Sequence, residues 1–192
     1  MSKDSTQQIV GIISENANND GRPIANLLER YFPNKATYYQ LREGGAGSRL
    51  ENPKDFKNIK AQFDKFQPNL VIIIRDLDKD ENKKERDTRF DEYCALFSSH
   101  TIHLLFVYMI EELVVIDLNA IELYYDAKVI RKNLPREQKT VDKQLKQIVG
   151  YRKSDMRDLA DLLNKQILYN NYTIWKDFID EIANIFDAKP VF

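Results

Sequence analysis

The run Val71-Ile-Ile-Ile-Arg75-Asp76-Leu77-Asp78-Lys79-Asp80 decides the fold class of this 192-residue chain. A short apolar segment rich in β-branched residues passes directly into alternating carboxylates. Such a segment is typical of a strand that is buried on both faces of an α/β sheet. Ligands of open α/β sheets bind beyond the carboxyl ends of the strands, so we expect Asp76 and Asp78 to lie at a binding site.

Carboxylates held this close together repel one another, and the repulsion is costly unless a cation offsets it. Oxygen ligands of this kind suit Mg²⁺ or Mn²⁺, so Asp76, Asp78 and Asp80 are candidate metal ligands. Two other interpretations fit the same run. It could begin a solvated turn that Lys79, Lys83 and Lys84 neutralise, or it could bind a nucleotide or nucleotide-sugar.

The composition is that of an ordinary soluble globular protein. Hydrophobic residues make up 43% of the chain and charged residues 31%, proportions that do not fit a disordered chain. No apolar run approaches membrane-spanning length, and the first residues lack the apolar core of a signal peptide, so we expect a cytoplasmic protein. The single cysteine, Cys94, excludes an internal disulfide and a zinc site built from cysteines.

The net charge of −1 argues against a protein coated with positive charge for nucleic acid. A local basic patch is still compatible with it, because the acidic residues can be concentrated at a metal site. Residues 128–157 are rich in lysine and arginine. This stretch could hold a phosphate backbone, or it could be the solvated face of a helix.

Strands and helices are expected to alternate along the first two thirds of the chain. Apolar runs and β-forming residues predict strands over residues 8–14, 36–41, 71–75 and 102–107. Helical spacing predicts helices over residues 23–31, 53–66, 83–99 and 109–121. Beyond Pro135 only helices are expected, over residues 138–149, 154–168 and 173–187.

This alternation predicts an α/β fold with a mostly parallel sheet of four to five strands and helices on both faces. The later residues predict a helical C-terminal extension. We therefore expect an α/β domain over residues 1–130, with a helical extension over residues 131–192 packed on it.

The order of the acidic residues resembles that of the TOPRIM domain over roughly the first two thirds of the chain. Glu15 follows the first predicted strand and matches the glutamate of that family's first strand. Asp76 and Asp78, with Asp80 beyond them, match its acidic motif. The resemblance rests on order and spacing as well as on residue type.

A narrower similarity is to the small stand-alone TOPRIM-like proteins encoded beside ABC-type ATPases in bacterial defence loci. In those proteins a glycine-containing segment precedes the acidic strand, as Gly44–Gly47 does here. A glutamate-rich helix start that ends in aspartate resembles the segment from Glu111 to Asp117, and a Tyr-x-Lys segment resembles Tyr151-Arg152-Lys153.

The chain departs from this pattern after Glu15. The family's glutamate is usually followed by glycine, whereas Asn16 stands here. An acidic residue is expected four positions after the glutamate. That position holds Asn19, and Asp20 comes one place late.

The resemblance implies a Mg²⁺- or Mn²⁺-dependent nuclease that hydrolyses phosphodiester bonds of DNA or RNA. The metal ligands that it implies are Glu15, Asp76, Asp78, Asp80 and Glu111. The catalytic residues that it implies are Glu15, Asp76, Asp78 and Lys153. The phosphate-binding residues that it implies are Gly45, Gly47, Arg152 and Lys153. It also implies an ABC-type ATPase as partner and a role in phage or plasmid defence; a homo-oligomer stays open.

Other interpretations remain open from the residues alone. Glu15 could cap a helix, Glu111 and Glu112 could simply favour a helix N-terminus, and the glycine cluster could be a plain turn. The whole chain could also be a regulatory partner of the ATPase, with a weak or inactive acidic site. Dependence of cleavage on Asp76 distinguishes this alternative from the nuclease.

Overall fold

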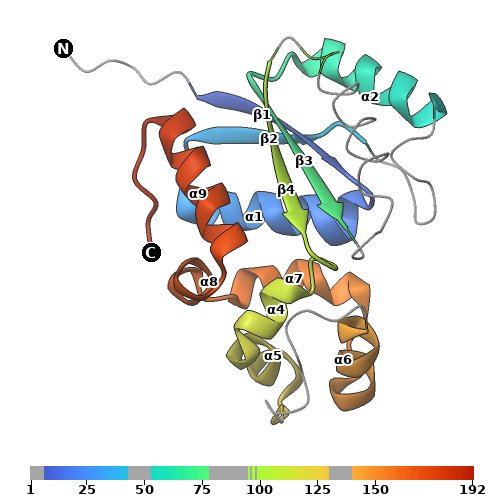
Figure 1. Cartoon of the computed structure of the whole chain (residues 1–192), viewed down its shortest axis with the longest axis vertical. Coiled ribbons are helices and arrows are strands. Elements are labelled where there is room, and N and C mark those ends of the chain that lie inside the picture. The colour runs from blue at the N-terminus through green and yellow to red at the C-terminus, as the bar shows by residue number, and fades with distance from the viewer. Residues whose placement is uncertain (1–6, 43–52, 78–94, 96, 98, 130–139) are drawn as a thin grey trace.

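In a computed structural model of the chain, the structure describes residues 7–42, 53–77, 95, 97, 99–129 and 140–192. Its centre is a sheet of four parallel strands in the order β2-β1-β3-β4 (Figure 1). The strands are β1 (Gln8–Ser14), β2 (Ala36–Gln40), β3 (Leu70–Asp76) and β4 (His100–Phe106). Because all four run the same way, their carboxyl ends lie along one edge of the sheet.

The central strand β3 is buried along almost its whole length, as its apolar sequence predicts. Its side chains alternate between the two faces of the sheet. Ile72 and Ile74 belong to one hydrophobic core, whereas Val71 and Ile73 belong to a second one. The sheet therefore has a buried core on each face.

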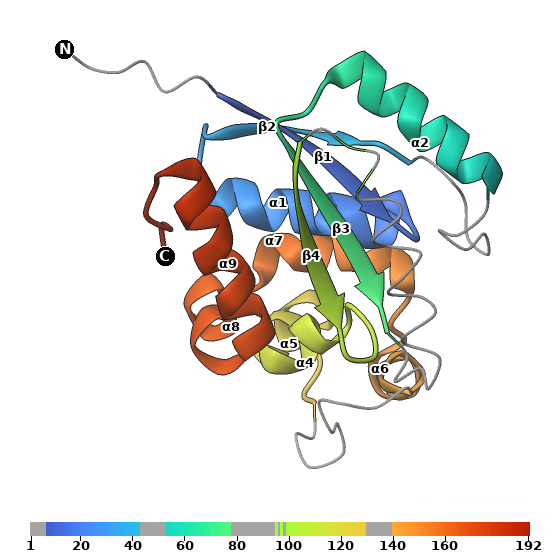
Figure 2. The same ribbon diagram turned by 45° about the horizontal axis from the view of Figure 1, so that its top comes forward.

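Helices cover both faces. The helix α2 (Pro53–Phe66) packs Ile59 and Phe63 against the smaller core. The helix α1 (Arg22–Tyr31) packs against the larger core on the opposite face, as Figures 1 and 2 show. α1 begins with Pro23 in its first turn, where the missing N–H of proline costs nothing.

The helices after β4 extend the larger core. They are α4 (Glu112–Ile116), α5 (Leu118–Tyr125), α6 (Val141–Val149), α7 (Met156–Leu162), α8 (Lys165–Asn171) and α9 (Thr173–Phe186). The Nη1 atom of Arg30 in α1 donates a 2.6 Å hydrogen bond to the carbonyl oxygen of Ala160 in α7. The indole Nε1 of Trp175 in α9 donates to the hydroxyl of Tyr31 at 3.1 Å. These bonds join α7 and α9 to α1, on the same side of the sheet (Figure 2).

The coarse fold class is confirmed: the chain is α/β with a parallel sheet. The strand predicted over residues 102–107 begins two residues earlier than expected, at His100. The helix predicted over residues 109–121 is wrong as a single element, because α4 and α5 meet at Asp117. The helix predicted over residues 154–168 is likewise divided between α7 and α8, at residues 163–164.

Some predictions are not tested by the fold. Most of the helix predicted over residues 83–99 lies outside the described residues. The division into two domains at residue 130 stays a prediction, as does the TOPRIM resemblance. Among the described residues, no helix is both long and apolar enough to cross a membrane.

Candidate functional site

Three strands direct acidic side chains to one edge of the sheet. Glu15 follows β1, Asp76 is the last residue of β3, and Glu111 lies after β4, where α4 begins. Burial raises the pKa of Asp76 well above its usual value, and the charges of Asp20, Glu111 and Glu15 raise it further. The fold thus brings three of the predicted residues near one another. It also adds Asp20, which lies one position later in the sequence than the acidic residue that the resemblance implies.

Asp20 reaches the site because the turn that carries it is wider than an α-helix. Residues Ala17–Gly21 form a π-helix, here called η1. The N–H of Gly21 donates to the carbonyl oxygen of Asn16, five residues earlier, at 3.3 Å. Such a turn accommodates one more residue than an α-helical turn and is frequent at functional sites. The place where Asp20 comes one residue later than the resemblance implies therefore falls within η1.

Asn16 explains why this turn forms. Its side-chain Oδ1 accepts hydrogen bonds from the N–H groups of Asn18 and Asn19, at 3.0 and 3.1 Å. The backbone N–H of Asn16 in turn donates to Oδ2 of Asp20 at 2.9 Å. Asparagine is a preferred N-cap residue, so Asn16 in place of glycine is a capping signal. Two signals in the sequence therefore indicate Asp20 as a site residue. One is the N-cap asparagine directly after Glu15, and the other is an acidic residue one position later than the resemblance implies.

Asp20 titrates far from its ordinary range. Burial raises the pKa of Asp20 from 3.8 to about 7, and the charges of Glu111 and Glu15 contribute to the rise. The hydrogen bond from Asn16 and the charge of Lys153 act in the opposite direction. The pKa of Asp20 is therefore raised by burial and by neighbouring carboxylates, and the charge of Lys153 offsets only part of the rise.

We expect the metal-free protein to lose stability as the pH rises from about 4 to about 7. The unfolded Asp20 has a pKa of 3.8 and the folded one a pKa of about 7, so the folded state holds more protons between these values. Stability is greatest below the lower pKa and falls until the pH passes the upper one. Asp20→Asn should therefore raise the free energy of unfolding by about 1–2 kcal/mol at about pH 8.

Denaturant unfolding in EDTA at about pH 5 and about pH 8 measures this difference. Asp177→Asn, at an exposed position of α9, is the matched control and should change neither value. Equal pH dependence in the wild type and in Asp20→Asn would contradict the prediction.

Glu111 offers an unpartnered oxygen to the site. The side chain is 1% exposed, and its Oε1 accepts a hydrogen bond from the hydroxyl of Tyr151 at 3.1 Å. Its other oxygen, Oε2, is buried and has no hydrogen-bond partner among the described residues. Burial raises the pKa of Glu111, whereas the charge of Lys153 lowers it. A buried carboxylate oxygen without a partner is costly unless a cation or a donor satisfies it.

The neighbouring Glu112 has a structural role instead. Its Oε1 accepts hydrogen bonds from the N–H groups of Tyr108 and Met109, at 2.6 and 3.2 Å, and its Oε2 accepts one from the hydroxyl of Tyr172. Glu112 therefore satisfies backbone donors in the segment between β4 and α4. Of the two adjacent glutamates, Glu111 is the one whose negative charge raises the pKa of Asp76.

Lys153 is the cation that faces these carboxylates. It lies in η3 (Lys153–Asp155), the short turn that leads into α7. Loss of water lowers the pKa of Lys153, but the charges of Glu111, Asp76 and Asp20 raise it, and the net shift is upward. Arg152 instead pairs with Asp155 through Nη2 and Oδ1 at 3.1 Å. Its predicted phosphate-binding role stays a prediction.

The position of Glu15 is fixed by a buried arginine. Arg42, which is 3% exposed, follows β2 and donates through Nη1 to the carbonyl oxygens of Ser14 and Glu15. Its Nη2 forms a 3.0 Å ion pair with Oδ2 of Asp55 in α2. Arg42 therefore links the end of β1 to the end of β2 and to α2. The sequence analysis missed this residue.

The donor set suits a hard divalent cation, because every acidic group offers oxygen and one buried oxygen is unpartnered. Over the residues that the structure describes, no group of three or more histidine, cysteine, aspartate or glutamate side chains has the arrangement of a metal site. The predicted ligands Asp78 and Asp80 and the predicted phosphate-binding Gly45 and Gly47 lie outside the described residues. Metal binding therefore stays a prediction.

Comparison of the chain with protein-family models, with curated proteins and with solved structures finds no match.

Proposed function

We propose that the chain is a divalent-metal-dependent nuclease of the TOPRIM type, acting on phosphodiester bonds of DNA or RNA. One observation carries the proposal. Four carboxylates from three strand ends influence one another, and burial together with the charges of Asp20, Glu111 and Glu15 raises the pKa of Asp76. Such strongly perturbed groups gather at functional sites more often than elsewhere. The resemblance in acidic-residue order supports the same conclusion.

Each residue has a distinct part in the proposed reaction. Asp76, Asp20 and Glu111 are the proposed metal ligands, with Asp78 and Asp80 joining them. Glu15 is a ligand or the general base that takes a proton from the attacking water. Lys153 places its ammonium group against charge that develops on the phosphate oxygens. Bound Mg²⁺ or Mn²⁺ supplies polarisation of the scissile phosphate and a lower pKa of the attacking water.

We extend the proposal to the setting that the resemblance implies. There the chain works in the cytoplasm with an ABC-type ATPase, in defence against phage or plasmids. The alternative is a regulatory subunit of such an ATPase. That alternative predicts a stable complex with the ATPase and no cleavage.

The test is a cleavage assay on supercoiled plasmid, linear DNA and RNA with Mg²⁺ or Mn²⁺, with and without an ABC-type ATPase. Glu15→Ala should reduce cleavage by at least about 10²-fold, because it removes a ligand or base next to the reacting phosphate. Glu181→Ala is the matched control: Glu181 lies at the opposite edge of the sheet, 4.0 Å from His100 at the start of β4. Cleavage that persists in Glu15→Ala, or is absent under every condition, would contradict the proposal.

A further inference from the structure

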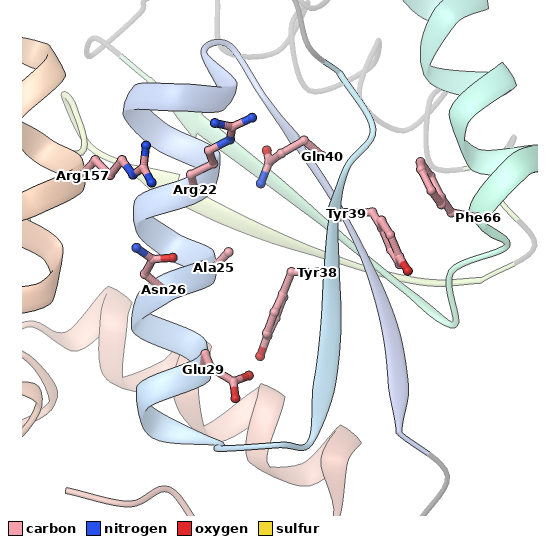
Figure 3. A pocket seen from close by; sticks show the side chains of 9 residues that line it. All are labelled: Arg22, Ala25, Asn26, Glu29, Tyr38, Tyr39, Gln40, Phe66 and Arg157. Carbon is pink, nitrogen blue, oxygen red and sulfur yellow. The ribbon is translucent and has the colours of Figure 1, made fainter.

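A groove of about 450 Å³ lies between α1 and the edge strand β2. Figure 3 shows α1 on one side of the groove and the strand on the other, with Arg157 of α7 on the side of α1 that faces away from the strand. The volume is that of a small-molecule site, and it has room for a mononucleotide or for one nucleotide unit of a single strand.

Two arginines line this groove. Arg22 and Arg157 are both exposed, and within the described part of the chain neither guanidinium has a hydrogen bond or an ion pair. Among the described residues that line the groove, the acidic one is Glu29, whose Oε1 accepts a hydrogen bond from the N–H of Asn34 at 2.9 Å. Glu29 keeps its negative charge, but it lies beside Tyr38, away from both arginines (Figure 3). Paired guanidinium groups of this kind match the oxygens of a phosphate.

The groove also contains polar atoms that the protein leaves unsatisfied. The hydroxyl of Tyr38 and Oε1 of Gln40 are buried, and neither has a partner among the described residues. Buried polar atoms normally have a hydrogen-bond partner, so each such atom requires an explanation. A ligand with its own donors and acceptors, such as a base or a sugar, would satisfy both.

The groove lies beside the acidic site. Arg22 comes two residues after Asp20, and Arg157 comes four residues after Lys153. Gln40 packs directly on η1, because a Cβ atom added to Gly21 would lie only 2.1 Å from its Oε1. In addition, η1 contacts both η3 and α7. A ligand in the groove would therefore adjoin a phosphate at the carboxylates.

We propose that the α1–β2 groove binds a nucleoside phosphate, as the nucleotide unit of a single strand next to the scissile phosphate. Arg22 and Arg157 bind the phosphate oxygens, while Tyr38 and Gln40 hydrogen-bond to the base or sugar. The strand as the source of this unit rests on the proposed nuclease function. The binding chemistry of the groove does not, because it involves none of the acidic residues.

The experiment measures binding without metal, so that cleavage plays no part. Fluorescence anisotropy in EDTA follows short single-stranded DNA and RNA over a range of salt concentrations, and calorimetry follows AMP and inorganic phosphate. The double variant Arg22→Ala/Arg157→Ala should bind the strand about tenfold more weakly or worse. The salt slope should fall by about 1.4, because two phosphate contacts are lost and each contributes about 0.7 on a single strand. Arg22→Lys/Arg157→Lys, which keeps the charge, should give an intermediate affinity.

The matched control is Lys57→Ala/Lys189→Ala, which removes the same number of exposed positive charges from α2 and from the C-terminal segment. Equal affinity and equal salt slope in the two alanine double variants would overturn the proposal, as would a wild type that binds no strand and no AMP. Arginine-dependent binding of AMP without binding of strands would support the groove and assign it to free nucleotide. Arginine-dependent strand binding without any metal-dependent cleavage would uphold the groove and overturn the nuclease.

Discussion

Replacing Asp76 with asparagine should reduce metal-dependent cleavage by at least about 10³-fold, because the variant loses a charged oxygen ligand at the centre of the site. The fold should tolerate the change. Oδ1 of Asp76 accepts a 2.9 Å hydrogen bond from the N–H of Ile110, and the asparagine oxygen can accept it equally well. The loss of a repelled charge should even stabilise the metal-free protein, so reduced activity would not reflect unfolding.

The measurement compares initial cleavage rates of the wild type and of Asp76→Asn at saturating Mg²⁺ or Mn²⁺, together with melting temperatures in EDTA. Asp117→Asn is the matched control, a carboxylate that is 3% exposed and accepts a 2.7 Å bond from the N–H of Asn164. It should keep its cleavage rate. Full activity in Asp76→Asn would remove Asp76 from the proposed mechanism, and equal losses in both variants would indicate a general effect of burying an amide.

Arg42→Ala should lower the free energy of unfolding by about 3 kcal/mol, because it leaves Asp55 and two strand-end carbonyls without their partner. The arginine is 3% exposed and its aspartate partner 18% exposed, so water replaces the lost bonds poorly. The end of β1, and with it Glu15, loses its anchor. We therefore expect slower cleavage as well, through misplacement of Glu15.

Denaturant unfolding measures this loss in the free energy of unfolding. The double variant Arg42→Ala/Asp55→Ala shows how much of the loss comes from leaving Asp55 without its partner. Lys60→Ala is the matched control in α2, because it breaks an ion pair of similar length, 2.9 Å, whose partners are 46% and 59% exposed. It should cost only about 0.3–0.5 kcal/mol. A loss in Arg42→Ala no larger than this would show that the buried pair contributes no more than a surface pair.

The elements that sequence reasoning placed well are those whose signals are local. The helix α2 begins and ends where its spacing of apolar residues and Pro53 predict. The strand β3 was recognised because an apolar run between polar residues fits few other structures. The break between α4 and α5 at Asp117 was missed, because apolar residues continue through it and give no local stop signal.

Part of the candidate site was also predictable, because some of its residues have a local signal in the sequence. Glu15, Asp76 and Glu111 each follow a strand, and parallel topology brings such residues to one edge. Arg42 could not be found in this way, because its hydrogen bond to Ser14 joins residues that are 28 positions apart. The α1–β2 groove was hidden for the same reason, since its arginines come from helices that are distant in sequence.

The π-helical turn after β1 has a consequence for how such chains should be aligned. Relative to the TOPRIM pattern that the sequence resembles, Asp20 comes one residue late, and the π-helical turn η1 is wide enough to take up one such residue without a shift of β1 or α1. An alignment to that pattern with constant spacing after Glu15 would pair the expected acidic position with Asn19. An alignment that permits a single-residue gap within η1 would pair the same position with Asp20.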